Sequence, residues 1–332
     1  MVRAGRGLTA REFAALAIPV STITGLFDGA QPGALHYFRE HLASLPSADH
    51  TLLIGPWDHF GSQRRPSPVL GHRRIDPVAN LDIIGINFQW MEHVLRGGPE
   101  PLMLSDRMNF QVIGTNSWRH VPSLAAISND TLTRYLNAER AGIDHRLLPV
   151  PDSTSTGVDL QVDLTNRTEV SSTFIAVGYD STLARSNGVA FMSDPLPAAT
   201  TISGAFSGDL VATLNVRDVD VGVVLYELTA AGKYIQLSFY LGRASVARNP
   251  TQRQLLTPGS RERIPLNGAR IISRVVPAGS RLVAVVNVNK NPDSQINYGS
   301  GKDASDETIR DATVPVGLTL FGTSHLRIPV LR

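Results

Sequence analysis

The sequence predicts an α/β segment over residues 1–118, followed by an all-β sandwich over residues 119–332. Two patterns support this division. The first part contains short apolar runs, at Val20–Thr24 and Thr51–Ile54, that alternate with apolar residues at helical spacing. From about Phe110 onward the apolar residues recur every second position, as in strands. A length of 332 residues also favours two domains over one.

The α/β segment is expected to contain parallel strands covered by helices. The strands at Val20–Thr24 and Thr51–Ile54 are each closed by a glycine and are apolar on both faces, which is typical of parallel strands. Apolar residues at helical spacing predict helices over residues 32–42 and 83–95. The second helix is expected to stop at Gly97.

The later part of the sequence predicts a jelly-roll type of sandwich. Its strands are punctuated by Gly, Pro, Asn and Asp, and the intervals between them are uneven. The expected strands begin at Leu210, Val221, Tyr234, Ala269 and Arg281. Residues 150–175 are rich in Ser and Thr and are expected to form a long loop. Asp218 and Asp220 share one strand face and are expected at a solvated edge.

Composition and charge exclude several classes of function. Lys+Arg 31 against Asp+Glu 29 gives a net charge of +2, a near balance. The basic pairs at residues 64–65 and 73–74 lack interleaved aromatic residues, so no nucleic-acid partner is expected. No apolar run reaches the roughly 18 residues of a membrane span, so no membrane partner is expected. Residues 1–8 contain no signal-peptide core, which makes a cytoplasmic location the default expectation.

The sequence also predicts no cofactor and no metal site. It contains no cysteine, which excludes disulfides, thiolate catalysis and Cys-ligated zinc. It contains no H-E-x-x-H zinc motif, no EF-hand loop and no Gly-rich phosphate loop. His36 and His41 are five positions apart and do not share a helix face. Catalysis, if present, must therefore use ordinary side chains.

Asp28 and His59 are the two candidate catalytic residues. Each follows one of the two predicted parallel strands, and the carboxyl ends of such strands meet at one edge of a sheet. Their order matches the Asp and His of an α/β-hydrolase triad, in which a serine on a G-x-S-x-G elbow precedes both. No G-x-S-x-G occurs in the 332 residues. The simpler alternatives are a turn aspartate that binds backbone amides and an ordinary polar loop histidine.

Five segments carry a family resemblance. Gly25-Leu-Phe-Asp28-Gly is similar to a G-W-Y-D-G loop, and Leu53-Ile-Gly-Pro-Trp-Asp-His59 is similar to an "hIGPWxH" segment. Weaker similarities follow at residues 112–119, 297–301 and 324–330. In this order the motifs resemble the C-terminal portion of the cocaine-esterase and X-Pro dipeptidyl-peptidase family of α/β-hydrolase serine hydrolases.

The resemblance implies a fold and a function. It makes the first segment the C-terminal part of an α/β-hydrolase parallel sheet, with residues 1–17 as a possible cap remnant. The later segment becomes a galactose-binding-like jelly roll. Asp28 and His59 become triad residues of an enzyme that cleaves small esters or X-Pro peptides. Trp57 is expected to be a packing residue rather than a substrate platform.

The missing nucleophile leaves two alternatives. In the first, a separate N-terminal hydrolase half, or self-association, completes the site, and this chain alone is inactive. In the second, the chain is a non-catalytic, truncated relative whose jelly roll serves binding or assembly. Either way, one strand of the α/β segment should have an open edge, and the helix over residues 32–42 should expose apolar surface.

Overall fold

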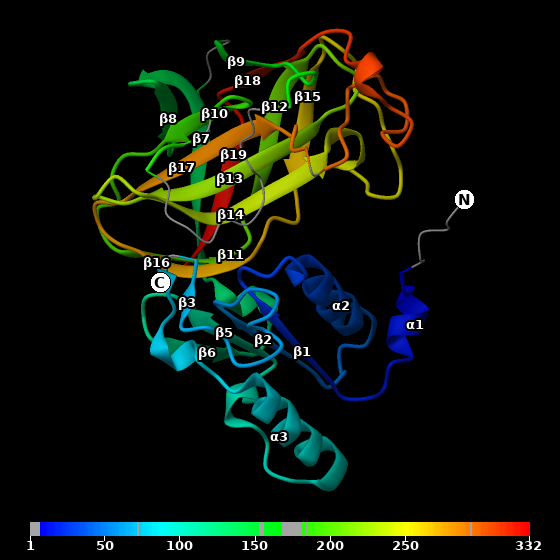
Figure 1. Ribbon diagram of the computed structural model, residues 1–332, viewed down its shortest axis with the longest axis vertical. Coiled ribbons are helices and arrows are strands. Elements are labelled where there is room, and N and C mark those ends of the chain that lie inside the picture. The colour runs from blue at the N-terminus through cyan, green and yellow to red at the C-terminus, as the bar shows by residue number, and fades with distance from the viewer. Residues whose placement is uncertain (1–6, 72, 153–155, 168–180, 184, 293) are drawn as a thin grey trace. The chain divides into compact units, whose positions relative to one another are not determined.

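The computed structural model describes residues 7–71, 73–152, 156–167, 181–183, 185–292 and 294–332. The chain forms two compact units, Met1–Ile127 and Ser128–Arg332 (Figure 1). The sequence-based boundary between residues 118 and 119 falls inside the strand β6 (Ser117–Val121). This strand hydrogen-bonds to β5 (Met108–Val112) and therefore lies in the first unit.

A four-stranded sheet forms the centre of the first unit. Its order is β1-β2-β5-β6, where β1 is Val20–Gly25 and β2 is His50–Gly55. β2 pairs in parallel with both β1 and β5, whereas β5 and β6 are antiparallel. The two strands expected before residue 60 are thus present and parallel. A two-stranded ribbon, β3 (Val69–Leu70) and β4 (Arg73–Arg74), lies outside this sheet.

Two long helices pack on opposite faces of this sheet. They are α2 (Gln31–Ser44) and α3 (Ile83–Arg96). The His50 ring packs against Phe38 of α2, whereas Leu53 packs against Ile83 of α3. Residues 50 and 53 of one strand point to opposite faces, so the helices do as well. α3 begins at the N-cap Asp82 and ends at Gly97, as expected, in the left-handed conformation with φ 68°.

The expectation of exposed apolar surface on the first helix holds for one residue, because Tyr37 of α2 is 48% exposed. Leu35 and Phe38 of α2 are 3% and 1% exposed. The short helix α1 (Ala10–Ala14) packs beside α2, with Phe13 buried and its ring 5.6 Å from that of Tyr37. More exposed apolar residues lie on α3. They are Ile84, Phe88, Met91 and Leu95.

The second unit is a β-sandwich, as predicted. Its strands pair in the order β14-β13-β17-β10-β8-β7-β19-β12-β18-β9, with β11 joined to β19 and β16, and β15 joined to β12. β19 pairs with β7, β11 and β12, and so links the strands into one hydrogen-bonded network. The strands are β7 (Asp130–Ala141), β8 (Asp144–Leu148), β9 (Gly157–Val162), β10 (Gly188–Met192), β11 (Thr200–Gly204), β12 (Ser207–Leu214), β13 (Asp220–Leu228), β14 (Tyr234–Arg243), β15 (Arg261–Leu266), β16 (Ile272–Val276), β17 (Arg281–Val288), β18 (Val316–Phe321) and β19 (His325–Leu331).

Two expectations about the second unit are wrong. Gly157–Val162 was expected in a loop but forms β9, whose buried and exposed residues alternate. Residues 168–175 of that predicted loop lie outside the described residues. Asp218 and Asp220 are buried rather than solvated. Arg253 pairs with Asp218 at 3.1 Å and Arg243 pairs with Asp220 at 2.8 Å, as buried carboxylates require.

Candidate active site

The loops after β1 and β2 are hydrogen-bonded to each other. The amide of Leu26 donates to the carbonyl of Gly55 at 2.7 Å, and the amide of Phe27 donates to the carbonyl of Trp57 at 3.0 Å. A Cβ at Gly25 would lie 2.0 Å from the Trp57 carbonyl oxygen, so only glycine allows this close approach. The two loops are therefore held side by side before any catalytic side chain is considered.

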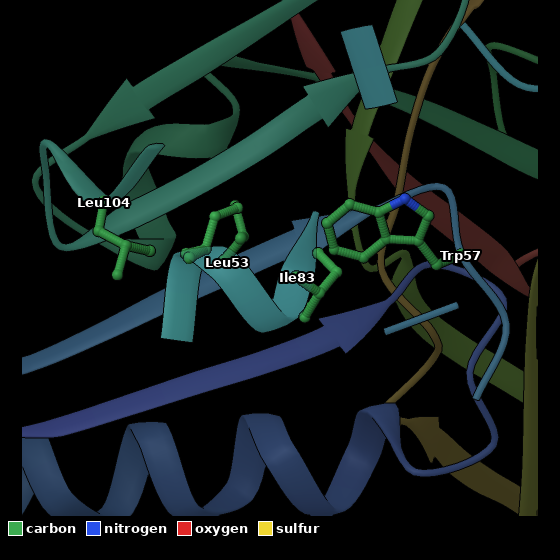
Figure 2. Close-up of a cluster of buried hydrophobic side chains, with 5 residues drawn as sticks. Leu53, Trp57, Ile83 and Leu104 are labelled. Atoms are coloured by element: carbon green, nitrogen blue, oxygen red, sulfur yellow. The ribbon is translucent and has the colours of Figure 1, made fainter. Parts of the chain in front are cut away.

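Trp57 anchors the second loop to the core. Figure 2 shows its ring beside Ile83, at one end of a buried cluster that also contains Leu53 and Leu104. Its Nε1 donates a hydrogen bond of 2.8 Å to the carbonyl of Ala79, and the residue is 1% exposed. A Cβ at Gly55 would lie 2.5 Å from the indole ring. The Gly-Pro-Trp sequence is thus explained by packing, and the prediction that Trp57 is a packing residue is confirmed.

Asp28 is a buried carboxylate that accepts hydrogen bonds from several donors. It is 3% exposed. Oδ1 accepts from the amide of Ala30 at 2.8 Å, and Oδ2 accepts from the hydroxyls of Thr24 at 3.1 Å and Ser62 at 3.3 Å. Burial alone would raise the pKa of Asp28, but the hydrogen bonds from Ala30, His59 and Thr24 outweigh it and lower the pKa. Asp28 is therefore ionised at neutral pH.

His59 lies against this carboxylate. Its Nδ1 is 3.0 Å from Asp28 Oδ1, so the two residues expected at one edge of the sheet are within hydrogen-bond distance. Because an ionised carboxylate only accepts hydrogen bonds, Nδ1 carries the proton. In the neutral ring Nε2 is then the acceptor. The His59 side chain is 54% exposed, whereas that of Asp28 is 4% exposed.

Three further residues support the pair and were missed in the sequence. Thr24 and Ser62 bind Asp28, and Gln63 Nε2 lies 3.0 Å from His59 Nε2. Asp58 accepts the amide of Gly61 at 2.7 Å and bends the chain so that residues 62 and 63 return to the histidine. An aspartate three positions before a glycine-serine pair was the available signal for this turn.

The arrangement suits general acid–base chemistry. A neutral imidazole with its Nδ1 proton on a buried carboxylate can accept a proton at Nε2 and return it. Ser62 is buried, and its hydroxyl contacts Asp28 and the carbonyl of His59 at 2.9 Å rather than His59 Nε2. Ser62 is therefore unsuited to be the nucleophile.

Other kinds of site find no support in the described part of the chain. No three His, Asp or Glu side chains gather there as a metal site would need. Among the helices that the structure describes, none combines the length and apolarity needed to cross a bilayer.

A surface groove of about 490 Å³ lies in the second unit, beside β9, β12 and β18. Three of its polar side chains, Asp159, Asn215 and Thr319, already bond within the protein. Thr319 donates to Asp159 at 2.6 Å, and Asn215 bonds to the backbone of Pro315 and Gly317. The groove therefore gives no specific support to a binding function.

The structure thus consists of a unit that carries the hydrogen-bonded Asp28–His59 pair and a unit that is a β-sandwich. The X-Pro dipeptidyl-peptidase C-terminal non-catalytic domain family matches residues 103–317, more than half of the chain. The chain belongs to this family and represents the C-terminal part of the CocE/NonD and X-Pro peptidase hydrolases. Among curated protein sequences, the chain has no match.

Solved structures of hydrolases share this fold. An aminopeptidase from a marine sediment Thaumarchaeota archaeon matches 97% of this chain and 56% of its own, with 16% identity and a TM-score of 0.78. An α-amino acid ester hydrolase matches 97% and 57%, with 17% identity and a TM-score of 0.79. A CocE/NonD family hydrolase from Staphylococcus aureus matches 96% and 55%, with 13% identity and a TM-score of 0.63. The chain thus spans a little over half the length of these structures.

Proposed function

We propose that Asp28 and His59 form the acid–base pair of a serine hydrolase that cleaves acyl bonds in esters or X-Pro-type amides. The observation that carries this proposal is the hydrogen bond between His59 Nδ1 and the buried, ionised Asp28, made by a histidine whose side chain is 54% exposed. The first unit is then the C-terminal part of an α/β-hydrolase sheet. The second is a galactose-binding-like jelly roll.

In this mechanism His59 would take the proton of a serine hydroxyl at Nε2 and pass it to the leaving group. Asp28 would hold the ring in the required tautomer and stabilise its cationic form. The serine and the oxyanion-binding amides would come from outside these 332 residues. Neither Asp28 nor His59 attacks the acyl carbon itself.

The partner in this proposal is an α/β segment that carries the nucleophile. Within the described residues β1 pairs with β2 alone, so its other edge is open to one more strand. The exposed apolar residues of α3, from Ile84 to Leu95, offer a packing surface for a helix of the same segment. The additional length of the solved hydrolases is the natural source of such a segment.

Labelling by a fluorophosphonate probe tests the proposal. The chain alone should show no labelling and negligible turnover of p-nitrophenyl esters, because its sequence contains no G-x-S-x-G elbow to supply the nucleophile. The chain joined to, or expressed with, a segment bearing a G-x-S-x-G elbow should be labelled at that serine.

The variants His59→Ala and Asp28→Asn should each reduce turnover by the assembled enzyme about 10⁴-fold or more. His36→Ala is the matched control, because His36 is an exposed histidine of the same unit. Its turnover should be unchanged. Turnover that survives His59→Ala, or labelling of a serine within residues 1–332, would contradict the proposed roles.

A further inference from the structure

The outward nitrogen of His59 is already hydrogen-bonded. Gln63 Nε2 lies 3.0 Å from His59 Nε2, on the side of the ring opposite Asp28. Both side chains are exposed, so the contact is not forced by burial. It is a specific contact made by a residue that the proposed mechanism does not use.

The backbone turn that presents Gln63 is tied to the Asp–His pair itself. Asp58 accepts the amide of Gly61, and the amide of Ser62 donates to the carbonyl of Asp58 at 3.1 Å. The Ser62 hydroxyl lies 3.3 Å from Asp28 Oδ2 and 2.9 Å from the carbonyl of His59. The residue immediately before Gln63 is therefore fixed to both members of the pair. This places the Gln63 amide within reach of the ring.

The position of the proton on the His59 ring determines which group donates in this hydrogen bond. The Nδ1 proton of His59 points to Asp28, so the neutral ring has one lone pair, at Nε2. The Gln63 amide N–H donates to that lone pair. A serine hydroxyl that is to be activated must donate to the same lone pair. The two donors exclude each other.

We propose that Gln63 is a positioning residue that holds the place of the nucleophile hydroxyl at His59 Nε2 and is displaced when the nucleophile docks. The hydrogen bond from Gln63 to His59 Nε2, called the cap below, follows from the geometry alone. Its displacement by the serine rests on the proposed hydrolase function. Glutamine suits both protonation states of the ring. Rotation of its amide presents Oε1, which accepts the Nε2 proton of the imidazolium.

The cap is tested on the chain as it exists, by site-resolved carbethoxylation with diethyl pyrocarbonate followed by peptide mass spectrometry. The reagent attacks an available imidazole lone pair. Gln63→Ala should raise the rate at His59 about three- to tenfold, the loss expected for one exposed hydrogen bond. Gln63→Asn should behave similarly, because its side chain is one methylene shorter. His36 in the same samples is the internal reference.

A matched control and a spectroscopic readout separate this role from general structural effects. Gln89→Ala removes another exposed glutamine of the same unit and should leave the His59 rate unchanged. Gln63→Glu replaces the donor amide by a carboxylate, which only accepts hydrogen bonds, and should change the NMR chemical shift of His59 Nε2. An unchanged His59 rate in Gln63→Ala, with folding intact, would overturn the cap.

The displacement is tested in the assembled enzyme with the fluorophosphonate probe. Gln63→Ala should be labelled at least as fast as the wild type, because the glutamine has left the ring in the working state. A tenfold slower reaction in a folded Gln63→Ala enzyme would make Gln63 part of the working machinery and overturn its role as a placeholder. If the wild-type assembly is never labelled, the hydrolase proposal fails, while the carbethoxylation rates still decide the cap.

Discussion

The two units of this chain differ in how completely their strands are paired and their apolar residues are buried within the unit. In the second unit β13 lies between β14 and β17, and nearly all residues of β13 and β17 are buried. In the first unit β1 is a half-buried strand at the edge of a mixed sheet, where it pairs in parallel with β2. Its helix α3 also exposes four apolar residues, including Phe88 at 65% and Leu95 at 77%.

This difference indicates what stabilises each unit. A sandwich with buried central strands has its own core and needs no further segment. A parallel sheet with an open edge and an exposed apolar helix gains stability when another segment covers them. We therefore expect the first unit to depend on association and the second to fold regardless. The first unit is also the one that carries Asp28 and His59.

Hydrogen exchange should show the largest contrast. In a dilute monomer, amides around residues 210–240 should exchange only by global unfolding of their unit. Amides in residues 18–60 should open with a free energy about 5 kcal/mol lower. Equal protection of the two regions would show that the first unit is self-sufficient, and the argument for a docking segment would lose its basis.

Trp57→Ala should destabilise the first unit by about 4 kcal/mol, since it removes a fully buried ring from the core. The protection of residues 18–60 should then be lost, while the β-sandwich transition stays in place. Phe191→Ala in β10 is the matched control and should weaken the second unit instead. A simultaneous loss of both units in either variant would mean that they unfold as one.

Acid should weaken the first unit. Burial, together with the neighbouring His41 and Arg107, lowers the pKa of His50 from 6.5 to about 4. The His50 ring bonds His41 Nδ1 at 3.0 Å and the Thr22 hydroxyl at 2.8 Å. Between these pH values the unfolded chain binds a proton that the folded unit does not. The free energy of unfolding of the first unit should therefore decrease, by up to about 3 kcal/mol, as the pH is lowered through this range.

Denaturant titrations of the first unit at pH 7.0 and pH 4.5 measure this effect. The window lies above the lowered pKa of Asp28, whose contribution to stability is lost only at more acidic pH. His50→Gln should remove most of the pH dependence. If the stability of His50→Gln depended on pH as strongly as that of the wild type, the effect would come from other groups.

Phe88→Gln should have the smallest effect on stability. Its side chain is 65% exposed, so the free energy of unfolding should change by less than about 0.5 kcal/mol. Binding of the nucleophile-bearing segment, or self-association measured by sedimentation, should nevertheless weaken. Unchanged association in this variant and in Leu95→Gln would exclude α3 as part of the docking surface.

The sequence predicted the elements whose apolar residues recur with a clear strand or helix period. It failed where a polar composition or single charged residues suggested a solvent-exposed environment. The strands β1, β2, β13 and β17 and the helix α3 were expected close to their observed bounds. β9 was missed because the Ser- and Thr-rich residues around it suggested a loop. Asp218 and Asp220 were expected in solvent, because their arginine partners, Arg253 and Arg243, are distant in the sequence.

The sequence by itself determined the division into an α/β part and a β part, and it brought forward Asp28 and His59. Local periodicity and strand-end motifs carry that information, because both depend on residues that are neighbours along the chain. Only the tertiary structure decided which surfaces are covered and how the pair is supported. It buried Leu35 and Phe38 of α2 while leaving four apolar residues of α3 exposed, and it brought Thr24, Ser62 and Gln63 to the Asp–His pair. Such contacts depend on how loops cross in space, which no local pattern records.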